Sequence, residues 1–122
     1  MFEVTANVAK NLITLRLEGV ITQAELVKAG EEMLQAIDRL RPGLDFLADV
    51  RFVESTPEFE PAMSARVADK FRQRSLRRIV RVVGKKAQVA VKFEKASKVF
   101  GFSANLAYSM EEAERLLDAH SG

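Results

Sequence analysis

The sequence has no cysteine and no tryptophan, and its one histidine, His120, lies near the C-terminal end. The absence of cysteine excludes disulfide bonds, thiolate metal sites and cysteine nucleophiles. No group of His, Asp and Glu has the spacing of metal ligands, and no nucleophile has a recognisable base. We therefore expect a protein that is not an enzyme and holds neither a metal nor a cofactor.

Long apolar runs are also missing, because no run approaches the ~20 residues that a membrane-spanning helix needs. The N-terminal segment MFEVTANVAK lacks the basic and apolar regions of a signal peptide. We expect a cytoplasmic protein that is not an integral membrane protein. A chain of 122 residues with 48% hydrophobic and 30% charged residues fits one domain over 1–122, with 120–122 as a frayed tail.

The charge is distributed unevenly along the chain. Residues 66–98 contain twelve Lys and Arg against two acidic residues, which is a net charge of 12 − 2 = +10. Residues 1–61 contain six basic and eleven acidic residues, which is 6 − 11 = −5. Since local fields steer association, this asymmetry predicts a surface for an anionic partner, or self-association of acidic on basic regions.

Alternating apolar and polar residues in 2–8 and 12–17 predict a β-hairpin. Thr22 and Glu25 have the spacing of a capping box, which predicts a helix from there to about Leu40. An apolar strand is expected over 44–50.

The second half of the chain continues the alternation of helices and strands. Thr56 is the expected N-cap of a helix that starts at Pro57 and runs to about Arg74. The later elements are a strand over 79–83, a helix over 87–100, a strand over 105–108, and a last helix after Ser109. The order ββαβαβαβα predicts a single-domain α/β fold, with a mixed sheet of about five strands packed with about four helices.

Three segments, 11–22, 44–51 and 108–117, resemble the STAS superfamily, and more closely its small bacterial SpoIIAA-like proteins. The resemblance implies a regulatory module that works by protein contact, or one that binds a small anionic or lipid-like ligand. In anti-sigma-factor antagonists the third strand leads to a phosphorylated serine or threonine. The resemblance therefore implies a regulatory loop in the matching stretch of Glu54, Ser55 and Thr56, where Pro57 replaces the family's glycine. Capping of the next helix is the alternative role of the two hydroxyls.

The basic residues of the second half form a second candidate site. If the second and third helices are neighbours, we expect one continuous basic face. This face would bind another protein with an acidic surface, and a solvated surface is the alternative interpretation. Its residues are Arg66, Lys70, Arg74, Arg77, Arg78, Lys85, Lys86 and Lys92.

Other partners fit the same face. An anionic lipid or small anionic ligand is the runner-up, with its acyl chain in a hydrophobic groove between the two helices. A homodimer would pair the face with the acidic first helix, which carries Glu25, Glu31 and Glu32. Nucleic acid ranks below protein, because the basic segment has no RNA-binding or zinc-finger signature and little aromatic interleaving.

Overall fold

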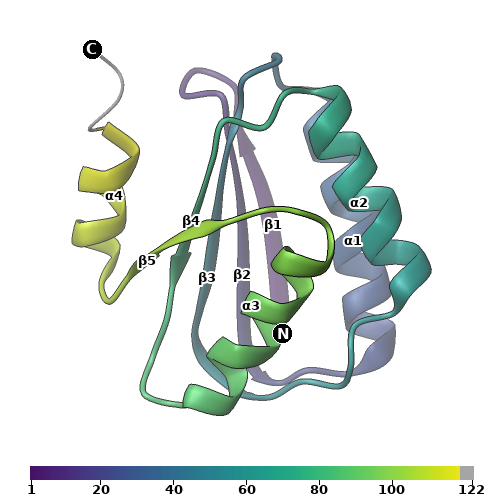
Figure 1. Ribbon diagram of the computed structural model, residues 1–122, viewed down its shortest axis with the longest axis vertical. Helices are drawn as coiled ribbons and strands as arrows, with labels where there is room; N and C mark the ends of the chain where they lie inside the picture. Colours follow the sequence, from purple (N-terminus) through teal and green to yellow (C-terminus); the bar gives the residue numbers. More distant parts are fainter. Residues whose placement is uncertain (119–122) are drawn as a thin grey trace.

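The computed structural model describes residues 1–118, which form a five-stranded sheet flanked by four helices (Figure 1). The elements in chain order are β1 (Phe2–Asn7), β2 (Leu12–Val20), α1 (Gln23–Asp38), β3 (Asp45–Ser55), α2 (Pro61–Gln73), β4 (Arg78–Val82), α3 (Ala87–Val99), β5 (Ala104–Ala107) and α4 (Met110–Asp118). The order of elements expected from the sequence is confirmed. The tail over 120–122 lies outside the described residues.

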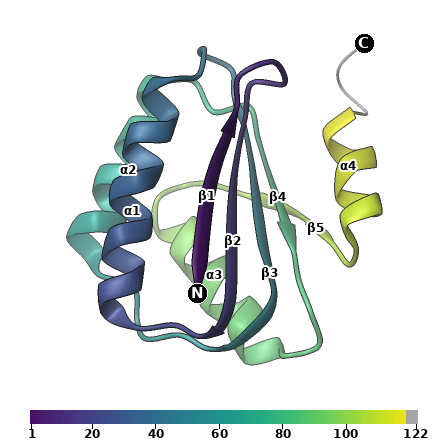
Figure 2. The same ribbon diagram turned by 180° about the vertical axis from the view of Figure 1, so that it is seen from behind.

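The strands lie side by side in their chain order, β1-β2-β3-β4-β5. The opening hairpin is antiparallel and every later pairing is parallel, so the predicted mixed sheet is confirmed. Crossovers between parallel strands are right-handed, and each one here steps by one strand in the same direction. This places α1, α2 and α3 on one face of the sheet, which we call the three-helix face, while α4 packs on the other, the α4 face (Figures 1 and 2).

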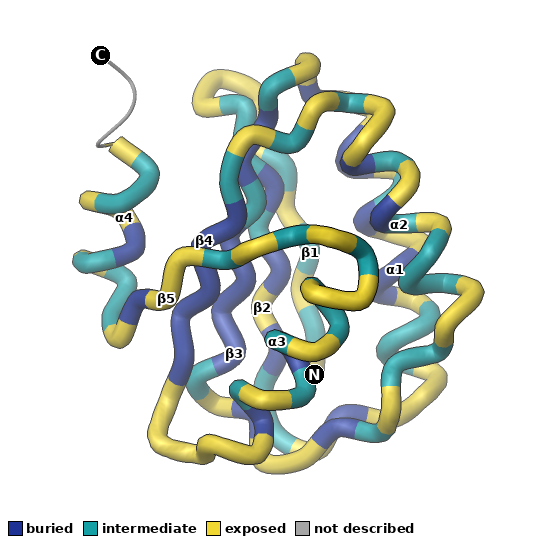
Figure 3. Tube along the Cα trace, in the orientation of Figure 1, coloured by how far each residue is buried: buried dark blue, intermediate teal, exposed yellow. Residues whose placement is uncertain are grey.

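The main core lies on the three-helix face, where alternate strand residues such as Ile13 and Leu17 meet Met33 and Ile37 of α1. A smaller cluster on the α4 face joins Leu47 of β3 and Val80 and Val82 of β4 to Ala113 of α4. The central strands are therefore covered on both sides, as the buried segments in Figure 3 show. This explains why the sequence over 79–83 is continuously apolar apart from one arginine.

The predicted capping box at the start of α1 is confirmed. The Thr22 hydroxyl accepts a hydrogen bond from the Glu25 backbone N–H at 3.1 Å, and the Glu25 carboxylate accepts one from the Thr22 backbone N–H at 3.0 Å. At α4, the Ser109 hydroxyl accepts from the Glu112 N–H. The Glu112 carboxylate accepts from the Tyr108 N–H rather than from that of Ser109, so only the hydroxyl half of a capping box forms at α4.

Three predicted boundaries are wrong, namely the ends of β2 and β3 and the start of α2. β3 runs on to Ser55 rather than ending at residue 50, because β2 extends to Val20 and pairs with this added stretch. The helix expected to begin at Pro57 begins instead at Pro61. Glu60 is its N-cap and accepts hydrogen bonds from the backbone N–H groups of Ala62 and Met63, so Thr56 does not cap the helix.

Within residues 1–118, no helix combines the length and the apolar character that crossing a membrane requires.

Candidate functional site

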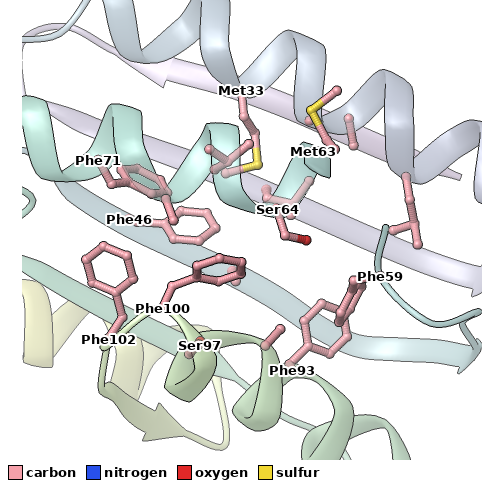
Figure 4. A pocket seen from close by; sticks show the side chains of 18 of the residues that line it. Met33, Phe46, Phe59, Met63, Ser64, Phe71, Phe93, Ser97, Phe100 and Phe102 are labelled. Atoms are coloured by element: carbon pink, nitrogen blue, oxygen red, sulfur yellow. The ribbon is translucent and has the colours of Figure 1, made fainter. Parts of the chain in front are cut away.

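An apolar cavity of about 180 Å³ lies between the sheet and the three helices α1, α2 and α3 (Figure 4). α1 and α2 pack against each other, and the space between α2 and α3 is incompletely filled. Six of the eight phenylalanines of the chain line this cavity, together with Met33, Met63 and small residues of both helices. The six are Phe46, Phe59, Phe71, Phe93, Phe100 and Phe102.

Contacts between the rings hold the cavity wall in place. Phe46 and Phe71 have ring centroids 5.2 Å apart, and Phe71 meets Phe102 edge-on at 6.4 Å. Phe59 of the loop before α2 lies 5.0 Å from Phe93 of α3. Aromatic pairs at these separations stabilise one another beyond simple burial, so the wall is preformed.

A wider groove of about 570 Å³ adjoins the cavity and runs between the start of α2 and the length of α3. Phe59, Ser64, Ala96 and Phe100 line both hollows, so the groove joins the cavity to the surface. Exposed valines of α3 and the lysines at positions 92 and 95 form its outer wall. The hydrophobic groove that the sequence suggested between these helices therefore exists, with basic residues at its mouth.

Arg81 of β4 is the one arginine among the cavity-lining residues, and only 3% of it is exposed to solvent. Its Nη1 donates to the Glu94 carboxylate at 3.0 Å, and its Nη2 donates to the Ser97 hydroxyl. Its Nε–H is buried and has no hydrogen-bond partner among the described residues. Burial lowers the pKa of Arg81, and the hydrogen bond and charge of Glu94 oppose that shift without cancelling it.

The three residues of the predicted regulatory loop differ in how far they are buried. Glu54 and Ser55 are exposed at the end of β3, whereas Thr56 is 5% exposed. The Thr56 backbone carbonyl accepts a hydrogen bond from the Lys92 ammonium at 2.6 Å, which ties the loop to α3. The three residues therefore do not form one exposed patch. A regulatory role for them stays a prediction.

The predicted basic residues are largely paired within the chain. Lys70 of α2 and Arg74, the C-cap of that helix, both reach Asp38 at the end of α1, at 2.9 and 3.6 Å. Arg77 contacts Asp45 of β3 at 2.6 Å. The acidic partners come from the first half of the chain, so folding neutralises part of the charge asymmetry that the sequence shows.

The remaining basic residues point to different parts of the molecule. Arg78 begins β4 and donates to the Leu116 and Leu117 carbonyls of α4. Lys86 follows the other end of β4 and donates to the Glu54 carbonyl at 3.4 Å. Among residues 1–118, the Arg66 and Lys85 side chains reach no polar partner. The expectation of one continuous basic face is wrong, because β4 separates these groups by a strand length of roughly 16 Å and Arg78 serves the α4 face.

Arg81 and Ser97 were absent from the predicted site. The signal for Arg81 is present in the sequence, since it is the only charged residue in the β-branched run of 79–83. A charge inside a strand that is buried on both sides requires an internal partner, and such positions often have a function. Ser97 lies one helical turn after Phe93, and no feature of its local sequence distinguishes it.

No cluster of three or more His, Cys, Asp or Glu side chains that could hold a metal occurs within residues 1–118.

Comparison with known proteins gives matches in structure only. No family model and no curated protein sequence matches the chain. The anti-sigma factor antagonist SpoIIAA in its unphosphorylated form superposes with a TM-score of 0.66 at 13% identity, covering 100% of this chain and 99% of that one. An uncharacterised protein from Shewanella loihica PV-4 with a SpoIIAA-like fold gives 0.64 at 11% identity, covering 96% and 92%. The chain therefore adopts a SpoIIAA-like fold, as the sequence resemblance indicated.

Proposed function

We propose that this chain is a non-enzymatic binding module whose cleft between α2 and α3 takes a small, largely apolar ligand. The observation that carries the proposal is the phenylalanine-lined cavity of about 180 Å³. An engineered protein cavity of roughly 150 Å³ lined by apolar side chains stays dry and binds benzene. A cavity of this size and chemistry is therefore a site for an apolar group rather than for ordered water.

The adjoining groove favours a ligand longer than the cavity alone would hold. It offers a further 570 Å³ and leads to the exposed side of α3. Burial of apolar surface contributes roughly 25 cal/mol per Å², so a ligand with an eight-carbon chain would bind with a Kd between roughly 10 µM and 1 mM. Affinities in this range suit a reversible sensor.

A regulatory role is the broader part of the proposal. One structure with this fold is, by its name, an anti-sigma factor antagonist, and that protein therefore acts within a regulatory system. Here α3 forms one wall of the cleft and also presents Val91, Val99 and Lys95 to solvent. A ligand that fixes the position of α3 would change a surface that a protein partner can read, with an acidic partner as the class expected from the lysines.

Titration with 1-octanol tests the binding function, followed by calorimetry and by the rise in thermal unfolding temperature. Ala96 lines both the cavity and the groove, so A96F should fill the space and weaken binding at least about tenfold. Ala62 is exposed on α2 and lines neither hollow, so A62F is the matched control and should bind as wild type does. Absence of saturable octanol binding to the wild type, or equal binding by A96F, would refute the function.

A further inference from the structure

We propose that the ligand of this cleft is a monocarboxylate with an apolar body, and that Arg81 and Ser97 hold its carboxylate inside the cavity. This inference rests on the binding function proposed above and adds the chemical class of the ligand. It depends on a comparison of three arginines within the molecule.

Arg51 and Arg77 each hold a carboxylate by the same edge of the guanidinium group. Arg51 donates from Nε to Asp49 Oδ1 at 3.0 Å and from Nη2 to Oδ2 at 2.9 Å. Arg77 makes the same two bonds to Asp45, at 3.0 and 2.6 Å. Parallel donors on one edge match the two oxygens of a carboxylate, which makes this the preferred two-point contact.

Arg81 lines the cavity and has no carboxylate on the corresponding edge of its guanidinium group. Its Nη2 meets the Ser97 hydroxyl and its Nε–H has no partner among the described residues, although the side chain is almost fully buried. Glu94 bonds to Nη1, which points away from this edge. A buried donor without an acceptor is rare in native proteins and calls for an explanation. A ligand carboxylate would accept from both Nε and Nη2, and the Ser97 hydroxyl would donate to it.

The charges around Arg81 favour a single negative charge on the ligand. The Glu94 side chain is 36% exposed and has Lys98 as a second partner at 3.8 Å, so it remains solvated if its bond to Arg81 weakens. Glu60 also lines the cavity, but its carboxylate already accepts from two backbone N–H groups at the start of α2. Arg81 supplies one positive charge, which it shares with Glu94, so the site suits at most a monoanion, whereas a phosphate dianion would leave a larger buried charge uncompensated.

The shape of the site limits the rest of the ligand. A cavity of about 180 Å³ holds a group of roughly benzene size, and the groove takes an extension toward solvent. The ring faces of Phe46, Phe71 and Phe102 offer no hydrogen bonds. The ligand class is therefore an aromatic or medium-chain aliphatic monocarboxylate, with its acid end inside the protein and its apolar end toward the groove.

The test compares octanoate with 1-octanol, which share an alkyl chain and differ in the charged end. By calorimetry at neutral pH, the wild type should bind octanoate roughly 10- to 100-fold more tightly, because hydrogen bonds to charged groups are the strong ones. R81M should lose this preference and keep its affinity for octanol. R66M removes an exposed positive charge without a partner and is the matched control, so it should keep the wild-type preference.

The possible outcomes separate the two proposals. If wild type binds neither compound, the binding function fails. If it binds both equally, or if R81M keeps the preference for the acid, the function stands and the carboxylate site is refuted. S97A provides an independent variant that leaves the buried charge in place, should R81M not fold. It should reduce the preference severalfold, and an unchanged preference in S97A would count against the site.

Discussion

The two faces of the sheet differ in whether their cores leave a cavity and in whether their buried charged groups are fully paired. On the α4 face a small cluster is fully enclosed, with Val80, Val82, Ala107 and Ala113 at 0% exposure. On the three-helix face the core is larger, yet it leaves a cavity between α2 and α3. Tight packing serves stability, whereas a preformed apolar hollow can serve binding, so the binding function proposed above belongs to the three-helix face.

Arginines repeat the contrast between the two faces. Arg51 holds Asp49, whose side chain lies on the side of β3 opposite Phe46 and the cavity, with both oxygens bonded. Arg81, on the cavity side of β4, keeps its Nε–H without a partner in the described chain. On the α4 side, the Arg51 and Asp49 charges are paired within the chain. The incomplete pairing of Arg81 lies where we propose that a ligand carboxylate binds.

A larger side chain introduced into the core of each face should produce the largest difference in stability. Ala113 of α4 is fully buried in the tight cluster, so A113L should lower the free energy of unfolding by about 1–3 kcal/mol. Ala68 of α2 lines the cavity, so A68L has room and should change stability by less than about 1 kcal/mol. Urea unfolding measures both variants. Equal losses would show that the cavity is not available space.

Removal of the Asp49 carboxylate, which is fully paired with Arg51, should have the next largest effect on stability. Asp49 is 4% exposed and accepts two bonds from the Arg51 side chain, so D49N should cost about 1–3 kcal/mol at neutral pH. Asp69 pairs with Arg72 on the surface of α2, and D69N is the matched control, with an expected change below about 1 kcal/mol. Similar losses in both variants would contradict the distinction between buried and exposed pairs.

The same pair predicts a pH dependence. Burial alone would raise the pKa of Asp49, but the Arg51 hydrogen bonds and the charges of Arg51 and Arg16 outweigh it, so the pKa lies below its ordinary value. Because the ionised form favours the folded chain, this stabilisation is complete above about pH 5 and declines as the pH falls below about 4. Urea unfolding of D49N and wild type at pH 7 and pH 3 should show the difference in stability shrinking at the lower pH. A constant difference would exclude the ionised pair as its source.

The smallest effects concern two helices of the three-helix face. α1 has a complete capping box, and T22A should lower stability by about 1 kcal/mol. The N-cap of α3 is Lys86, whose side chain makes no cap hydrogen bond although its backbone is extended as a cap requires. K86D should therefore raise stability by about 0.5–1 kcal/mol, through a cap and a favourable charge at the helix start. Thermal unfolding detects both changes, and a loss in K86D would contradict the prediction.

The sequence allowed the order of elements to be predicted because each signal was local. Alternation in the hairpin, the Thr22 capping box and the β-branched run of 79–83 each depend on neighbours within a few residues. The start of α2 was misplaced because Thr56 and Pro57 imitate a helix start. Glu60 and Pro61 supply a second start signal four residues later, and this is the one used.

The candidate site could be predicted only in part. The hydrophobic groove followed from two amphipathic helices expected to be neighbours, and the structure contains it. The continuous basic face did not follow, because Asp38 and Asp45 are remote in sequence from the residues they neutralise. Charge counts along a chain omit such long-range pairs. The open edge of Arg81 is likewise a property of the folded geometry, and the sequence shows only that an arginine interrupts an apolar strand.

Consecutive residues of β4 serve opposite layers of the molecule. Arg81 borders the cavity, while Val80 and Val82 on either side of it support α4. The strand is thus a partition one backbone thick between the cleft and the far surface. A movement of the Arg81 backbone would therefore also move Val80 and Val82, on which α4 packs. A change in the cavity could reach the opposite face of the sheet through one peptide unit.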